Sequence, residues 1–269
     1  MDEASDMDLF CYLSDPALPE LDDFTEGLRQ IMPNTLPQRA GRDMSNRRFF
    51  GTYEYDRLRR RATLIEYRVW IGAFDSNVKF FPIKFMESYV SQHPSMDEHY
   101  LEELDSYQRM RVLASNGDGV EDLLRLAKAK RETDLSYLRR LGLERYGKAM
   151  ANAVGQGLRR GGQDTASIFN LMAAVNWLIC ILYMMNDEYP GTLKWRASRR
   201  FLATLNRGPL VSDLLEAWWS SANALDIRKC MMAVRQLEDV IAYQWSESPW
   251  DECKERWWWQ NYDPSAAEG

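Results

Sequence analysis

The sequence is poor in the residues that zinc sites and histidine-based catalysis need. It contains two histidines, His93 and His99, and four cysteines, no two of which are close together in the chain. Structural zinc sites use four Cys or His ligands at paired spacing, and histidine catalysis needs that ring beside a nucleophile or an acid. The sequence therefore predicts no metal site, no cofactor and no catalytic residue.

Phosphate loops and magnesium clusters are lacking as well. The glycines between 155 and 161 have the wrong spacing for a dinucleotide loop and follow a helical pattern instead of a strand. Asp22, Asp23 and Glu26 could hold a hydrated Mg²⁺ only if they lined a cavity, and no second acidic motif is placed to face them. We therefore expect a non-enzymatic protein. The alternative of a helical enzyme requires a cavity lined by several carboxylates.

The start of the chain lacks the basic region and the apolar core of a secretory signal peptide. The scattered cysteines do not form the dense framework of a small disulfide-bonded domain. We therefore expect reduced thiols and an intracellular protein, either cytoplasmic or nuclear.

Basic residues are absent from the first 28 positions, which hold nine acids. Positions 29–61 then hold nine arginines against three acids. This asymmetry is typical of interaction tails. Because Pro16, Pro19, Pro33 and Pro37 also interrupt any long helix, residues 1–50 are predicted to form a largely disordered arm, acidic and then basic.

Within this arm, two short sets of apolar residues stand among the acids. Such residues are typical anchors for docking in the apolar groove of a partner protein, and the acids would steer the encounter. The alternative is that they fold back on the protein's own surface. The predicted partner-binding residues are Leu9, Phe10 and Leu13 in the first set and Leu21, Phe24 and Leu28 in the second, which has helical spacing.

The arginines that follow the arm suggest a second partner class. Guanidinium groups bind phosphates, and neighbouring aromatic rings can stack on bases. The candidate nucleic-acid-binding residues are Arg47, Arg48, Arg59, Arg60 and Arg61. The net charge of −6 opposes this function, and these arginines could instead neutralise the acidic arm. Later basic groups, such as Arg196 and Arg199, are interpreted as solvated helix faces.

Residues 51–94 show the pattern of strands. Apolar residues alternate with polar ones over 65–71, a turn sequence follows at 75–77, and 78–85 is again apolar and aromatic. The pattern predicts a β-hairpin near 63–85, with Pro82 confining its second strand to a sheet edge. A helix over 55–70 is the competing interpretation.

The most conspicuous segment runs from Thr165 to Asn186 and carries no charged residue. It is long enough to span a bilayer. Asn170 and Asn176 interrupt it, however, and amphipathic segments on both sides offer it a protein environment. We therefore predict the buried central helix of a helical core, not a membrane span.

Around this segment, apolar residues recur at helical spacing from about 95 to 260. Ser95 is expected to cap the first helix, and Thr133 or Asp134 to begin a new one. Further helices are expected near 195–205, 212–225 and 227–245. The predicted fold is mainly α, with a helical core over 95–260 and a tail over 261–269.

No protein family is recognisable in the sequence. Taken together, these features predict a regulatory or scaffolding protein that acts through protein–protein contacts made by its N-terminal arm. The alternative is a structural assembly protein of nucleocapsid or matrix type, which would form oligomers and bind RNA or a membrane surface.

Overall fold

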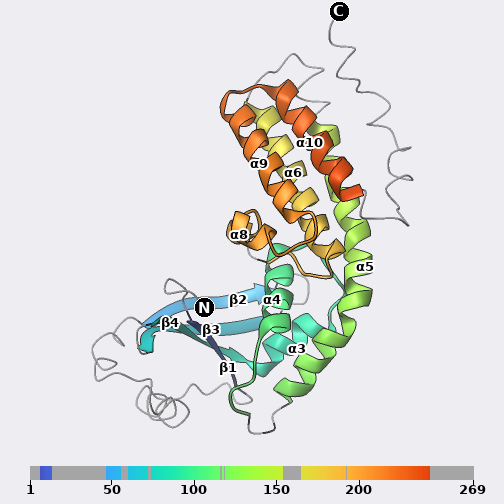
Figure 1. Ribbon diagram of the computed structural model, residues 1–269. Coiled ribbons are helices and arrows are strands. Elements are labelled where there is room, and N and C mark those ends of the chain that lie inside the picture. The colour runs from blue at the N-terminus through green and yellow to red at the C-terminus, as the bar shows by residue number, and fades with distance from the viewer. Residues whose placement is uncertain are drawn as a thin grey trace, which may run out of the picture. The chain divides into compact units, whose positions relative to one another are not determined.

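The computed structural model describes residues 7–13, 47–55, 60–71, 74–115, 117, 119–153, 165–191 and 193–242. These residues are drawn as coloured ribbon in Figure 1. Contacts divide the chain into two units. Unit 1 comprises residues 1–92 and 110–126, and unit 2 comprises residues 93–109 and 127–269.

Unit 1 is built on a four-stranded sheet with the order β1-β4-β3-β2. Its strands are β1 (Met7–Leu13), β2 (Arg47–Tyr55), β3 (Arg60–Ile71) and β4 (Phe74–Pro82). The pairs β2–β3 and β3–β4 are antiparallel, whereas β1 pairs with β4 in parallel. The chain's first strand therefore lies beside its last one in the sheet.

The predicted hairpin is confirmed by β3 and β4, which pair from Ile65 opposite Phe80 to Ile71 opposite Phe74. The competing helix over 55–70 is wrong, because Arg60–Ile71 forms strand β3. The edge position expected for β4 is also wrong, since that strand has a partner on each side. Pro82 is tolerated because it is the last residue of the strand.

Contacts between aromatic rings connect the end of β4 to α3 (Ile83–Ser91) within unit 1. The ring of Phe81 stacks on that of Phe85 with 4.8 Å between centroids, and Phe85 meets Tyr89 at 4.9 Å. Phe85 and Tyr89 are four residues apart and therefore lie on one helix face. These contacts tie α3 to the sheet.

Unit 2 is helical, which confirms the mainly α fold for the second half of the chain. Its elements are α4 (Glu98–Arg109), most of α5 (Val120–Asn152), α6 (Thr165–Met185), α7 (Leu193–Arg196), α8 (Arg199–Leu202), α9 (Gly208–Asn223) and α10 (Ile227–Ala242). The end of the helix expected over 227–245, the rest of the core predicted to reach 260 and the tail over 261–269 lie outside the described residues.

The first two helices of unit 2 differ in detail from the prediction. Asp97, not Ser95, caps α4, because its Oδ1 accepts hydrogen bonds from the backbone N–H groups of His99 and Tyr100. The break expected at Thr133 or Asp134 does not exist, and α5 runs through it unbroken. Asp134 is 4% exposed, and its Oδ2 accepts a hydrogen bond from the Tyr189 hydroxyl. Its carboxylate therefore contacts Tyr189 and does not cap a helix.

α6 is the buried central helix that the sequence predicts, and its bounds agree with the uncharged segment. α10 packs beside both α6 and α9, and the three helices run alongside one another in Figure 1. α5 approaches α6 closely at Gly142, where a Cβ atom would lie 3.1 Å from Cγ1 of Ile181. It also reaches α10, where the Tyr146 hydroxyl donates to Glu238 Oε2 at 3.0 Å.

A turn with a left-handed residue ends α6. Asp187 has φ of 57°, and the N–H of Glu188 donates to the carbonyl of Tyr183 at 3.0 Å, as in a Schellman motif. Arg139 on α5 donates to the carbonyl of Met184 and to the Asp187 carboxylate. The positive charge of Arg139 is also attracted to the negative, C-terminal end of the α6 dipole.

The single helix expected near 195–205 is instead two short helices, α7 and α8. α9 then begins at Gly208, where the sequence suggested only the end of the preceding helix. A Cβ at Gly208 would lie 1.7 Å from the carbonyl oxygen of Leu202, so only glycine fits this turn. Pro209 follows in the first turn of α9. Backbone N–H groups there have no acceptor within the helix, so the N–H that proline lacks is not missed.

Candidate partner-binding groove

The first predicted docking set lies within the sheet of unit 1. Leu9, Phe10 and Leu13 belong to β1, and Leu9 and Phe10 are half-buried. The ring of Phe10 stacks on Phe81 with 6.1 Å between centroids, and Tyr12 stacks on the same ring at 5.7 Å. β1 lies at the edge of the sheet. The second set, Leu21, Phe24 and Leu28, lies outside the described residues.

The candidate nucleic-acid-binding arginines do not converge in the register of the sheet. Arg47 and Arg48 lie opposite Tyr67 and Glu66, at one end of the β2–β3 pair. At the other end, Arg60 and Arg61 lie opposite Tyr55 and Glu54. Two of the four arginines, Arg48 and Arg61, therefore have an acid opposite them in the register. Arg59 lies outside the described residues.

Unit 2 contains a groove of about 630 Å³ between α6 and α9, which the sequence did not indicate. Each wall is one face of a helix, because the lining positions recur at steps of three and four residues. The lining residues are Met172, Val175, Asn176 and Ile179 on α6, Ser212, Leu215, Glu216, Trp218, Trp219 and Ser220 on α9, and Arg196, Ala197 and Arg199 between them.

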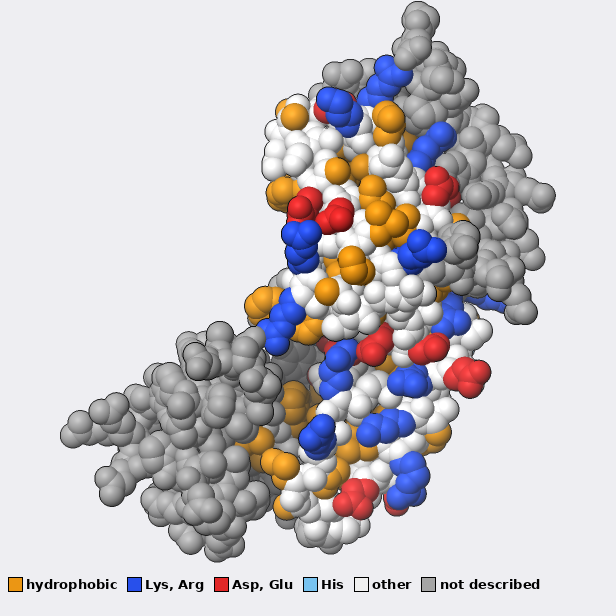
Figure 2. All heavy atoms as spheres, viewed as in Figure 1, with side chains coloured by type: hydrophobic (Ala, Val, Ile, Leu, Met, Phe, Trp, Pro, Cys, Tyr) orange, Lys and Arg blue, Asp and Glu red, His pale blue; other side chains and the backbone are white. Residues whose placement is uncertain are grey.

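The groove walls expose large apolar side chains. Met172 on α6 is 40% exposed, and Trp219 on α9 is 56% exposed. Phe169, one turn before Met172, is 61% exposed. Figure 2 shows hydrophobic side chains between charged ones on the visible face of the region that holds α9 and α10. A volume of this size with apolar walls is typical of ligand and peptide sites.

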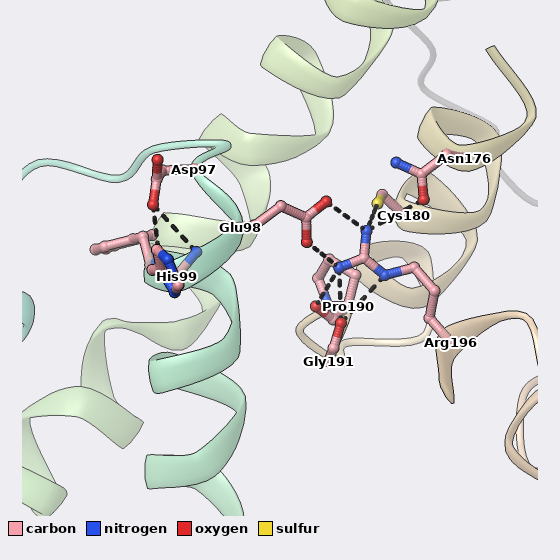
Figure 3. Close-up of polar contacts among 9 residues, drawn as sticks. Asp97, Glu98, His99, Asn176, Cys180, Pro190, Gly191 and Arg196 are labelled. Atoms are coloured by element: carbon pink, nitrogen blue, oxygen red, sulfur yellow. Dashed lines mark hydrogen bonds and ion pairs between the residues drawn. The ribbon is translucent and has the colours of Figure 1, made fainter. Parts of the chain in front are cut away.

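One end of the groove is formed by Arg196, which is 2% exposed. Figure 3 shows its guanidinium group surrounded by acceptors from several segments. It forms a two-pronged contact with the Glu98 carboxylate on α4, at 2.6 and 3.1 Å. Planar pairing of this kind is the strongest arrangement available to a guanidinium and a carboxylate.

The remaining donors of Arg196 bind α6 and the loop that follows it. Nη2 donates to the carbonyl of Gly191 at 2.7 Å, and Nη1 donates to Asn176 Oδ1 at 3.2 Å and lies 3.0 Å from Cys180 Sγ. The Tyr183 hydroxyl donates to the carbonyl of Arg196 at 2.9 Å. Arg196 therefore fixes α4, α6 and α7 together and holds one end of the groove in place.

The expectation that Arg196 lies on a solvated helix face is therefore wrong. Its charge is balanced by Glu98, which is 98 residues away in the sequence. The sequence around Arg196 does not indicate that it is buried. Its neighbours Trp195 and Ala197 are both exposed. Arg199, in contrast, is exposed and pairs with Asp213 at 2.9 Å and with Glu216 at 3.4 Å.

Burial controls the chemistry of the thiol beside the groove. It raises the pKa of Cys180 to about 12, although the Arg196 charge acts in the opposite direction. The thiol is therefore protonated at neutral pH, and a protonated thiol is a poor nucleophile and metal ligand. Among the described residues, no group of three or more His, Cys, Asp or Glu side chains is placed to hold a metal ion.

Among the described helices, α6 is the one that is long and apolar enough to cross a bilayer, with a mean hydropathy of 1.9 in its most apolar window. However, 56% of that window is buried inside the protein. A core helix passes the same test of length and composition. The groove lies along α6 from the exposed Met172 to the buried Val175 and Ile179.

Comparison with known proteins gives no relative for this chain. No protein-family model matches it, and no curated protein or solved structure matches it either. The function must therefore be inferred from the geometry of the groove.

Proposed function

We propose that this is a non-enzymatic regulatory or scaffolding protein, and that unit 2 binds an amphipathic helix of a partner protein in the α6–α9 groove. The observation that supports the proposal is the pair of exposed apolar side chains, Met172 and Trp219, on opposite walls of one groove. Two parallel walls with apolar stripes are suited to a helix that presents its own apolar face.

Two factors that favour helix binding, apolar surface to bury and a preorganised site, are present in this groove. Covering Met172 and Trp219 would remove apolar surface from water, which is worth about 25 cal/mol per Å² before the entropic costs of association. The Arg196 contacts hold one end of the groove in advance, so less ordering is needed on binding. Tryptophan is also among the residues that contribute most to binding energy at protein interfaces.

The charges at the groove define the partner further. Arg196, Arg199 and Glu216 line it, but the charge of the buried Arg196 is already balanced by Glu98. Arg199 is 70% exposed, so a carboxylate from a partner could replace one of its two present acidic neighbours. We therefore expect a partner helix with apolar anchors on one face and an acid placed to meet Arg199.

A displayed library of helical peptides tests this proposal. The purified full-length chain would be used for selection, and each selected peptide would then be measured against two variants. Trp219→Glu places a charge on the groove wall, whereas Met232→Glu places one at a 49% exposed residue of α10 outside the groove.

Selected peptides are expected to bind the wild-type chain and the Met232→Glu variant equally. They are expected to bind the Trp219→Glu variant at least about tenfold more weakly, the loss typical of a central interface residue. Circular dichroism would confirm that both variants keep the helical fold. A selection that yields no binders, or binders that tolerate Trp219→Glu, would contradict the proposal.

A further inference from the structure

Asn176 lies on the α6 wall of the groove, one helical turn from the exposed Met172. It is half-buried, and its neighbours along this wall, Val175 and Ile179, are apolar and buried. In a mostly apolar site, the few polar groups fix the orientation of the ligand and provide specificity. The contacts of the Asn176 amide therefore indicate what an occupant must supply.

The orientation of this amide is fixed by Arg196. Nη1 of Arg196 donates to Oδ1 of Asn176 at 3.2 Å. A guanidinium group has donors only, so the atom that faces it must be the amide oxygen and not the nitrogen. Figure 3 shows the oxygen directed at the guanidinium and the nitrogen turned away from it. Because Arg196 is itself held by Glu98 and the Gly191 carbonyl, the amide keeps this orientation.

The amide nitrogen of Asn176 differs in its contacts from those of two other asparagines. Nδ2 of Asn170 donates to the carbonyl of Ala166 at 3.0 Å, and Nδ2 of Asn186 donates to that of Leu182 at 2.8 Å. Each thus uses the carbonyl one turn earlier in the chain. No described residue accepts a hydrogen bond from Nδ2 of Asn176, and this nitrogen is not among the buried polar atoms that lack a partner. It is therefore accessible to an occupant of the groove.

We propose that Asn176 sets the specificity of the groove by donating from Nδ2 to an uncharged side-chain amide, that of Gln or Asn, on the partner helix. An apolar side chain placed there would cover the donor without supplying an acceptor, which is costly. A carboxylate would lose its hydration against apolar walls, and the charge of Arg196 is already balanced by Glu98. The assignment rests on the proposed function and names a feature of its partner.

The spacing along α6 determines where this amide must lie in the partner. Met172 and Asn176 are four residues apart, which is about 6 Å along the helix axis. The Gln or Asn of the partner is therefore expected three or four residues from the apolar anchor that covers Met172. Peptides selected for binding in the groove should share this spacing.

The first test is a double-mutant cycle on the full-length chain. In a peptide selected from the displayed library, each Gln or Asn is replaced by Leu, and binding is measured to the wild type and to Asn176→Leu. One replacement should weaken binding to the wild type about tenfold, because it leaves a buried donor without an acceptor. The same replacement should change binding to Asn176→Leu by less than about twofold. Asn170→Leu, outside the groove, should behave as the wild type does.

Coupling to Asn176 separates this inference from the proposed function. If selected peptides lose affinity for Trp219→Glu but no peptide residue couples to Asn176, the inference is wrong and the proposed function survives. If no peptide binds in the groove, both are contradicted. Replacing the coupled Gln by Glu should weaken binding at least about threefold. Tighter binding of the Glu peptide would overturn the assignment of an uncharged amide.

A measurement on the wild-type chain does not depend on how well Asn176→Leu folds. The side-chain NH₂ resonances of Asn176 are followed by NMR in ¹⁵N-labelled protein. Asn176→Asp, which keeps an oxygen facing Arg196, identifies these resonances by their loss. A peptide with the coupled amide should shift them downfield, whereas its Leu variant should not. Equal shifts with the two peptides would overturn the inference.

Discussion

Both halves of α6 are uncharged, but the first half carries Thr165, Ser167, Asn170 and Asn176, whereas the second half is almost entirely apolar. In the second half, every residue from Leu178 to Met184 is buried. In the first half, Phe169 and Met172 are exposed, and Asn176 is half-buried at the groove wall. Burial along this helix therefore follows both its own polarity, which is higher in the first half, and the contacts made by its neighbours.

The difference has a local cause. α5 reaches the second half of α6 at Gly142, and Arg139 and Arg196 satisfy polar groups near its end. On the first half, α6 and α9 leave a groove between them. One helix therefore supplies both the core of unit 2 and a surface that is available for binding.

The largest expected effect comes from truncating a side chain in the buried half. Leu182→Ala removes a fully buried side chain and should lower the free energy of unfolding by about 3 kcal/mol. Phe169→Ala, in the exposed half of the same helix, should change it by less than about 0.5 kcal/mol. Urea denaturation measures both. Equal losses would show that the two halves of α6 are not distinct.

The next largest effect is expected for the arginine that holds the groove end. Arg196→Ala should lower the free energy of unfolding by about 3 kcal/mol, because it leaves Glu98, Asn176 and the Gly191 carbonyl without their common donor. Arg199→Ala serves as the control. Its ion pairs are exposed, so a change within about 0.5 kcal/mol is expected. A loss for Arg199→Ala as large as that for Arg196→Ala would be inconsistent with the difference in burial.

A smaller effect is expected where α5 approaches the buried half of α6. Gly142→Leu would overfill the space before Ile181 and Met184 and should destabilise the protein by about 2 kcal/mol. Gly142→Ala should stay within about 1 kcal/mol, because the better helix propensity of alanine offsets the contact with two flexible side chains. Thermal unfolding of both variants checks this. A tolerated leucine would mean that the packing of α5 on α6 is loose.

The smallest effect concerns the acid buried within α5. Burial raises the pKa of Asp134 above its ordinary value of 3.8, although Lys130 acts in the opposite direction. The folded state therefore holds this proton more strongly than the unfolded state. The stability that Asp134 contributes is complete below pH 3.8 and is lost as the pH rises through its folded pKa.

Asp134→Asn, which does not titrate, should therefore become more stable relative to the wild type as the pH is raised from about 4 to 7, within about 1 kcal/mol. Denaturant unfolding at several pH values measures the difference. A difference that falls with rising pH would have the wrong sign.

Local patterns in the sequence were sufficient for the elements whose packing follows from periodicity. The uncharged segment predicted α6, the repeat of apolar residues at three and four predicted α10, and the period-two alternation predicted β3. The local pattern for helix capping failed at Asp134. A carboxylate that could cap a helix is instead buried within one, where its partner Tyr189 is 55 residues away.

The sequence by itself determined that the second half of this chain is helical and that Thr165–Met185 is its central helix, because hydrophobic periodicity is a local property. Only the tertiary structure decided that Arg196 is internal and that β1 joins β4. These features depend on contacts between residues far apart in the chain. The groove is the clearest case, because it exists only where α6 and α9 lie side by side.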